Sequence, residues 1–331
     1  MTTDRLDNRV TRMWALAGRD TLYLVGILLL AGLLLFFGRD LLQGSVLVTW
    51  GLTFGGTTAV VVLVAALYRV RIELRRSRRQ LARREAELTF AREVQRALFP
   101  KHLPSGDGLE FSAVCIPARG ISGDYYDVMQ LPDGRVVLAV ADISGKGVPA
   151  AILMANLQAV LRMIVESGRS PGEVVSKLSQ HLHQVTDASK FATFFYAEWN
   201  KADRLLRYVN AGHHSPIVIG SCRGQRLERG GLPLGVFPDL EFQTGEVELA
   251  AGDIIVVYSD GITEAVARSG DEFGEQRLEK IVESLAHEPL AEIQRRVLEA
   301  VRNWTNREPQ DDMTLLLVRA TGQLAGRSEE N

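Results

Sequence analysis

Residues 253–261 read DIIVVYSDG, in which five apolar or aromatic residues run straight into Ser-Asp-Gly. Residues 135–147 read RVVLAVADISGKG, and this second apolar run also ends in a carboxylate, Asp142. Short continuous apolar runs bounded by turn residues predict buried strands. Burying an unpaired carboxylate costs free energy. Two buried strands that each end in an aspartate therefore indicate that something at that place stabilises the charges.

The sequence from about residue 105 onward alternates short strands with turns and a few helices. We expect strands at 109–116, 124–131, 135–143, 191–200, 204–212, 254–260 and 313–320. We expect helices at 147–167, 171–186, 275–285 and 289–304. Strands outnumber helices and turns such as PDG at 132–134 indicate hairpins. The pattern predicts an α+β fold with antiparallel sheets and excludes a doubly wound parallel sheet.

Further acidic residues stand at predicted strand ends or sharp turns. They are Asp124, Asp127, Asp260, Asp311 and Asp312, beside Asp142. Each has an ordinary explanation when taken singly, because Asp-Gly after a strand is usually a turn and an Asp can cap a helix. Converging carboxylates repel one another unless a cation lies between them, and oxygen ligands suit Mg²⁺ or Mn²⁺.

Seven motifs occur in a characteristic order: GDYYD, VADISGKGVPAA, FATFFY, AGHHSP, LPLGV, VYSDGITEA and QDDMT. Together they resemble the metal-dependent Ser/Thr phosphatases of the PPM (phosphatase 2C-like) class, and more closely the bacterial RsbU/SpoIIE branch. The resemblance covers about residues 90–320, including AREVQRALFP at 91–100. It implies an α-β-β-α sandwich, with two Mn²⁺ or Mg²⁺ ions at one end of two antiparallel sheets.

The resemblance also implies roles for individual residues. Asp142 matches the metal-bridging aspartate, with the Ile143 backbone carbonyl beside it. Asp260 and Asp311 match ligands of the first metal, and Asp124 the acidic position near the second. Asp127 and Asp312 are further candidates. Asp142, Asp260 and Asp311 would hold the attacking water, and Arg119, five residues before Asp124, is a candidate phosphate contact.

Other residues near these motifs leave alternatives open. Lys146 in SGKG is a candidate phosphate ligand, although a P-loop needs the spacing GxxxxGK[ST]. His213 and His214 could supply a general acid or shape a turn. Cys115 and Cys222 have the spacing of neither a metal site nor a thiol phosphatase.

The first quarter of the chain differs from the rest in charge and hydropathy. Residues 1–84 contain thirteen Arg, no Lys and five acidic residues, a net charge of +8, so the remainder carries −10. Uncharged runs at 21–37 and 46–68 predict a transmembrane hairpin after a basic segment, 1–20. A signal peptide is the alternative for the first run. Arginines flank the hairpin, which predicts a multi-pass protein of the cell membrane with its catalytic domain in the cytoplasm. Lipid is therefore the expected partner of this region, and nucleic acid is not.

Residues 69–100 predict a helix that leaves the membrane. Leu74, Leu81, Leu88 and Gln95 repeat every seven residues, which favours a homodimer through 69–98. The alternative is a single helix held on anionic headgroups by its arginines. A phosphatase domain at 101–321 and a flexible tail at 322–331 complete the expected organisation.

These observations predict a membrane-anchored protein Ser/Thr phosphatase. The resemblance implies a phosphorylated STAS-type anti-anti-sigma protein as substrate, in a partner-switching pathway that regulates a sigma factor. One alternative is a catalytically silent, phosphatase-like scaffold at the membrane. Another is a phosphodiesterase or nucleotide cyclase, for which the sequence holds no GGDEF or HD-type cluster.

Overall fold

The computed structural model describes most of the chain. The described residues are 26–27, 30–33, 36, 46–104, 106, 108–118, 120–186, 189–220, 224–305 and 309–322. The basic segment 1–20, most of the predicted span 21–37, Arg119, Cys222 and nearly all of the tail lie outside them. The chain divides into two units, Met1–Arg84 and Glu85–Asn331.

The first unit is helical where it is described. Helix α2 (Val46–Leu98) includes the whole predicted second span and continues into the second unit. The hydroxyls of Thr57 and Thr58 donate to the carbonyl oxygens of Thr53 and Phe54 one turn earlier, so the helix satisfies them itself. The stretch Trp50–Leu98 is long and apolar enough to cross a membrane, but so is the core helix at Val148–Ser167. Length and composition are therefore weak evidence, and the hairpin stays a prediction.

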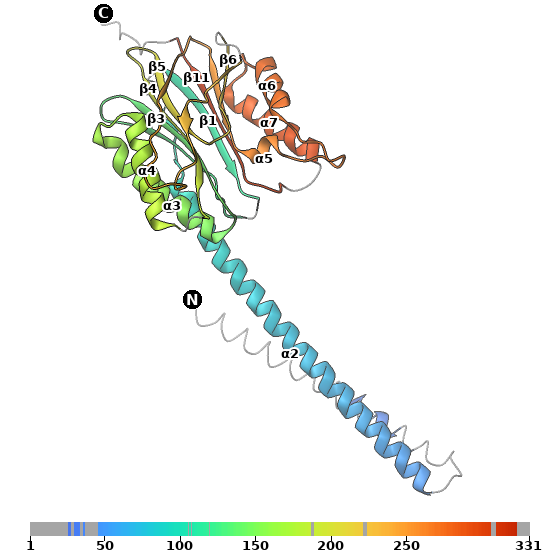
Figure 1. Ribbon diagram of the computed structural model, residues 1–331. Coiled ribbons are helices and arrows are strands. Elements are labelled where there is room, and N and C mark those ends of the chain that lie inside the picture. Colours follow the sequence, from blue (N-terminus) through green and yellow to red (C-terminus); the bar gives the residue numbers. More distant parts are fainter. Residues whose placement is uncertain are drawn as a thin grey trace, which may run out of the picture. The chain divides into compact units, whose positions relative to one another are not determined.

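The second unit holds two sheets packed face to face, with helices on both outer faces (Figure 1). The first sheet has the order β1 (Leu109–Ile116), β11 (Met313–Ala320), β10 (Ile254–Tyr258), β6 (Ile217–Ile219) and β7 (Gln225–Arg226). The second has the order β2 (Tyr125–Gln130), β3 (Val136–Ile143), β4 (Ala192–Asn200), β5 (Leu205–Ala211) and β8 (Gly230–Gly231), with β9 (Gly245–Glu248) on β5. Apart from the parallel β5–β8 pair, the pairings between these strands are antiparallel, which confirms the predicted α+β sandwich.

The helices divide between the two outer faces. Helix α3 (Val148–Ile164), the short η1 (Val165–Ser167) and α4 (Pro171–Val185) cover the second sheet. Helices α6 (Glu275–Ser284) and α7 (Leu290–Thr305) cover the first, and α5 (Asp260–Thr263) is a single turn after β10. Sequence patterns missed α5 and β6 to β9, because elements this short carry no periodicity.

Burial on both faces explains the continuous apolar runs. In β3, Val137, Ala139 and Ala141 face α3 and α4, while Leu138 and Val140 fill the space between the sheets. In β10, Ile255 and Val257 face the other sheet, and their neighbours pack against α6 and α7. By this alternation, Asp142 continues the row that faces between the sheets, and its environment depends on what lies at that end of the sandwich.

Candidate active site

Strand register brings the acidic segments together at one end of the sandwich. Tyr125 in β2 pairs with Ala141 in β3, so Asp124 lies opposite Asp142. In the other sheet, Tyr258 in β10 pairs with Leu315 in β11, which sets Ser259 opposite Thr314. Asp260 therefore lies next to the turn that holds Asp311.

Backbone contacts fix Asp260 beside Asp311. The hydroxyl of Ser259 donates to the Asp312 carbonyl oxygen (3.0 Å) and accepts from the Thr314 amide (2.9 Å). A Cβ atom on Gly261 would lie 2.1 Å from the Asp312 carbonyl oxygen, which no side chain allows. Glycine is therefore required where α5 begins, because two backbone segments touch there.

The carboxylate of Asp312 is saturated by donors from one loop. It accepts from the amides of Ala118 and Gly123 and from the hydroxyl of Ser122, each at 2.8 Å. The same Ser122 hydroxyl accepts from the Asp124 amide at 2.9 Å. Asp312 thus positions the loop that carries Asp124, and its oxygens have protein partners in place of a cation.

Gln95, at the end of α2, holds the same loop from its other side. It is 6% exposed, its Nε2 donates to the Ser122 carbonyl oxygen (2.7 Å), and the Ser122 amide donates to its Oε1 (2.9 Å). Sequence reasoning missed this role, as it missed those of Ser122 and Ser259. The available signal was a polar residue in the heptad row otherwise formed by leucines.

The pKa values of three carboxylates in the cluster are raised, as expected where acidic side chains are buried close to one another. Burial, and then the charge of Asp142, raise the pKa of Asp124 well above its usual range. Burial, and then the charges of Asp260 and Asp311, raise the pKa of Asp142 to about 7. Burial and Asp311 also raise the pKa of Asp260. The charged forms of these three carboxylates are therefore destabilised by burial first and then by their neighbours.

The donor set fits divalent cations. Asp124 is 2% exposed, and its Oδ2 has no hydrogen-bond partner among the described residues. Gly123 leaves space beside the Ile143 carbonyl oxygen. A Cβ atom at position 123 would lie 3.2 Å from that oxygen and crowd it. Carboxylate and carbonyl oxygens are the ligands that Mg²⁺ and Mn²⁺ prefer.

Asp127 does not join this cluster. It lies in β2 on the face covered by α3, and Arg162 of that helix donates to both of its oxygens (2.8 and 3.0 Å). The Tyr125 hydroxyl donates to it as well (2.6 Å). Because neighbouring residues of a strand point to opposite faces, the buried carboxylate of Asp127 is separated from Asp142 by the sheet.

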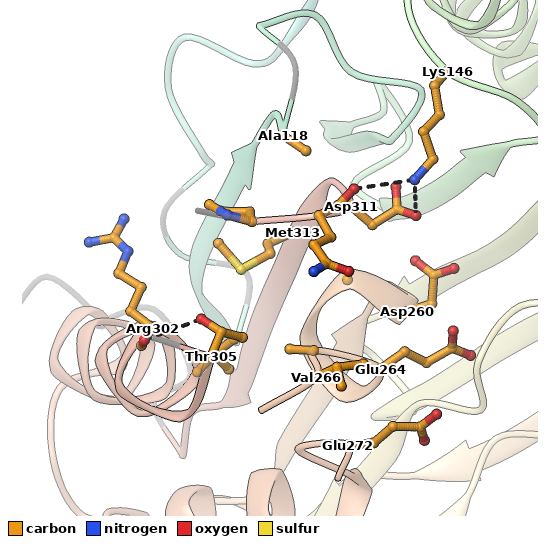
Figure 2. Close-up of a pocket in the computed structure, with 15 residues that line it drawn as sticks. Ala118, Lys146, Asp260, Glu264, Val266, Glu272, Arg302, Thr305, Asp311 and Met313 are labelled. Atoms are coloured by element: carbon orange, nitrogen blue, oxygen red, sulfur yellow. Dashed lines mark hydrogen bonds and ion pairs between the residues drawn. The ribbon is translucent and has the colours of Figure 1, made fainter. Parts of the chain in front are cut away.

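The cluster opens into a cavity of about 610 Å³ lined by Lys146, Asp260, Asp311 and Arg302, among others (Figure 2). Lys146 Nζ donates to Asp311 Oδ2 at 2.5 Å, and the pair is about half exposed. Within the described part of the chain, no three His, Cys, Asp or Glu side chains are arranged closely enough to bind one metal ion without moving.

The two adjacent histidines have different surroundings. His213 is buried, its amide donates to Asn210 Oδ1 (2.8 Å), and its Nδ1 lies 2.9 Å from Thr193 Oγ1. Burial, and then the charge of His214, lower the pKa of His213 to about 3, so it is neutral and shapes the turn. His214 packs on Tyr258 and lines a second cavity of about 340 Å³ with Asp142 and Asp260.

Comparison with known proteins settles the family. Residues 132–321 match the family model of stage II sporulation protein E (SpoIIE). The chain belongs to this family. It is 31% identical over 238 residues to the phosphoserine phosphatase RsbU of Bacillus subtilis, covering 71% of this chain and 70% of RsbU. The SpoIIE-family match spans β3, β10 and β11, which carry Asp142, Asp260 and Asp311 at their ends.

Solved structures agree with the SpoIIE-family assignment. The RsbU and RsbW domains of Rv1364c from Mycobacterium tuberculosis superpose with a TM-score of 0.60 at 27% identity, over 67% of this chain and 63% of that one. The SiaA-PP2C domain of Pseudomonas aeruginosa gives 0.64 at 22% identity, over 72% and 98%. The chain therefore carries a PP2C-type phosphatase domain, with the mixed α+β fold of two sheets flanked by helices.

Proposed function

We propose that this protein is a metal-dependent protein Ser/Thr phosphatase. The observation that carries the proposal is the convergence of Asp124, Asp142, Asp260 and Asp311 at one end of the sandwich, with an unpartnered oxygen on Asp124 among the described residues. Burial and neighbouring charges raise the pKa values of Asp124, Asp142 and Asp260. Two bound Mn²⁺ or Mg²⁺ ions would supply an activated water and stabilise the charge that develops on the phosphoryl group.

The chain's own residues would divide the work as follows. Asp142, Asp260, Asp311 and Asp124 would hold the ions, with the Ile143 carbonyl as a further ligand. Asp312 and Ser259 would keep these carboxylates in place through the hydrogen bonds described above. The cavity beside Asp260 and Asp311 would receive the phosphorylated side chain. Arg119, which lies outside the described residues, is the proposed phosphate contact.

The proposed substrate is a phosphoserine or phosphothreonine on a STAS-type anti-anti-sigma protein. RsbU is named a phosphoserine phosphatase, and the Rv1364c structure joins an RsbU domain to an RsbW domain. Both relatives support a place in a partner-switching pathway. The composition of residues 21–68 supports a membrane anchor with the catalytic domain in the cytoplasm, and the heptad at 74, 81 and 88 supports dimerisation through 69–98.

Phosphate release tests the proposal directly. The full chain should release phosphate from a phosphoserine STAS protein in Mn²⁺ and not in EDTA. Asp260→Asn should abolish release while the circular dichroism spectrum stays unchanged. A wild-type chain that binds the phosphoprotein but releases no phosphate at any metal concentration would instead identify a silent scaffold.

A further inference from the structure

Lys146 lies in the turn between β3 and α3, four residues after Asp142. Its Nζ donates to Asp311 Oδ2 (2.5 Å) and to the Gln310 carbonyl oxygen (3.3 Å), so the side chain reaches across the mouth of the acidic cluster (Figure 2). Gly145 and Gly147 on either side have φ values of 103° and 78°, which only glycine adopts readily. The two glycines thus set the backbone of the turn from which Lys146 extends to Asp311.

Both oxygens of Asp311 are already engaged. Oδ1 accepts from the Asp312 amide at 3.0 Å, and Oδ2 accepts from Lys146. In the described ranges, no three acidic, histidine or cysteine side chains are close enough together to bind one metal ion in their present conformations. Asp311, whose carboxylate is held by Lys146, is one of the residues that the proposed metal site needs as a ligand.

We propose that Lys146 is an internal cation that competes with the divalent metal ion for Asp311. In the metal-free protein the ammonium holds Oδ2, and an incoming ion must displace it before Asp311 can serve as a ligand. The inference rests on the proposed metal site. It assigns to Lys146, a residue that the proposed function leaves without a role, the effect of weakening metal binding.

The chemistry of lysine suits such a role. Its ammonium is a compact, strongly hydrated charge on a flexible four-carbon stem, so it can withdraw into water without disturbing the turn. Lys146 and Asp311 are 44% and 41% exposed, which leaves solvent open to the displaced ammonium. Half-exposed ion pairs are weak, so breaking this one should lower metal affinity only several-fold and leave the folded state intact.

Metal binding by Lys146→Met tests the proposal without any catalytic readout. The metal-stripped full chain would be titrated with Mn²⁺, and free Mn²⁺ would be followed by electron paramagnetic resonance. We expect Lys146→Met to bind Mn²⁺ about three- to tenfold more tightly than the wild type, because it removes both the competitor and its repulsion. Lys146→Arg keeps a cation and should stay within about twofold of the wild type.

Lys190→Met is the matched control. Lys190 donates to the Ser144 carbonyl oxygen (3.5 Å) beside the same turn, and within the described part of the chain it forms no ion pair. Removing its charge should change the Mn²⁺ dissociation constant by less than about twofold. An equal gain in Lys190→Met would reduce the effect to overall charge and overturn the competition.

The outcomes separate this inference from the proposed function. An Mn²⁺ affinity that is unchanged or weaker in Lys146→Met overturns the inference. If Lys146 only positioned Asp311 for the metal ion, its removal would weaken Mn²⁺ binding. Asp260→Asn should lose Mn²⁺ binding whatever Lys146 does. If Asp260→Asn binds Mn²⁺ like the wild type, the metal site itself is wrongly assigned. Thermal unfolding of each variant in EDTA verifies that it is folded.

Discussion

Gln95 and Ser122 exchange two hydrogen bonds across 27 residues of sequence, one in each direction between a side-chain amide and a backbone peptide group. Ser122 in turn donates to Asp312 and precedes Asp124 by two residues. The last turn of α2 is therefore joined to the candidate metal site by two side chains and one loop.

Replacing Gln95 with Ala should weaken the site as well as the fold. The Ser122 peptide group would lose both partners in a buried place, which costs about 1–3 kcal/mol. We expect a lower melting temperature in EDTA and weaker Mn²⁺ binding, because Asp124 follows Ser122. Gln158→Ala is the control, since this second buried glutamine makes a 3.4 Å contact with the Leu98 carbonyl oxygen. Equal Mn²⁺ affinity in both variants would contradict the link.

Gly261→Ala should separate Asp260 from Asp311. Its Cβ would lie 2.1 Å from the Asp312 carbonyl oxygen, and backbone cannot yield as a flexible side chain can. We expect at least a tenfold loss of Mn²⁺ affinity together with a lower melting temperature. Gly322→Ala, whose Cβ would make an ordinary 3.5 Å contact with Ala251, should behave like the wild type. A Gly261→Ala variant that binds Mn²⁺ normally would show that this contact does not set the site.

Asp311 and Asp312 should respond differently to the same substitution. Asp311→Asn removes a proposed ligand, so Mn²⁺ affinity should fall more than tenfold while stability in EDTA is kept. Asp312→Asn places an amide group against three donors from residues 118–123, so the melting temperature in EDTA should fall by several degrees. The reverse pattern would exchange the two roles.

His213 should make the protein sensitive to acid. Its pKa is lowered from 6.5 to about 3 by burial, so below pH 6.5 the unfolded chain binds a proton that the folded chain excludes. Stability is therefore fully present above pH 6.5 and is lost progressively as the pH falls toward about 3. Unfolding free energies at pH 7.5 and 5.0 should show a smaller difference in His213→Gln than in the wild type. His287→Gln, at an exposed histidine, should keep the wild-type difference.

Much of the fold could be predicted because burial leaves a pattern in the sequence. The expected strand 109–116 matches β1, and the apolar runs before Asp142 and Asp260 form β3 and β10. The pattern failed for β6 to β9 and for α5, which are short and depend on neighbours distant in sequence. The ordered motifs indicated the family. The structure places Asp124, Asp142, Asp260 and Asp311 at one end of the sandwich, and their roles as metal ligands stay a proposal.

By itself, the sequence determined the buried strands before Asp142 and Asp260, the class of fold and a set of candidate carboxylates, because hydrophobic runs and motif order can be read along the chain. Only the tertiary structure decided the partner of each carboxylate. Asp127 and Asp124 are three residues apart, yet one pairs with Arg162 on α3 and the other keeps an unpartnered oxygen in the acidic cluster. Asp311 and Asp312 are adjacent, yet one contacts Lys146 and the other a loop near residue 120. The partner of each carboxylate depends on strand register and sheet packing, because these bring together residues that are far apart in the sequence. No local pattern of residues encodes such contacts.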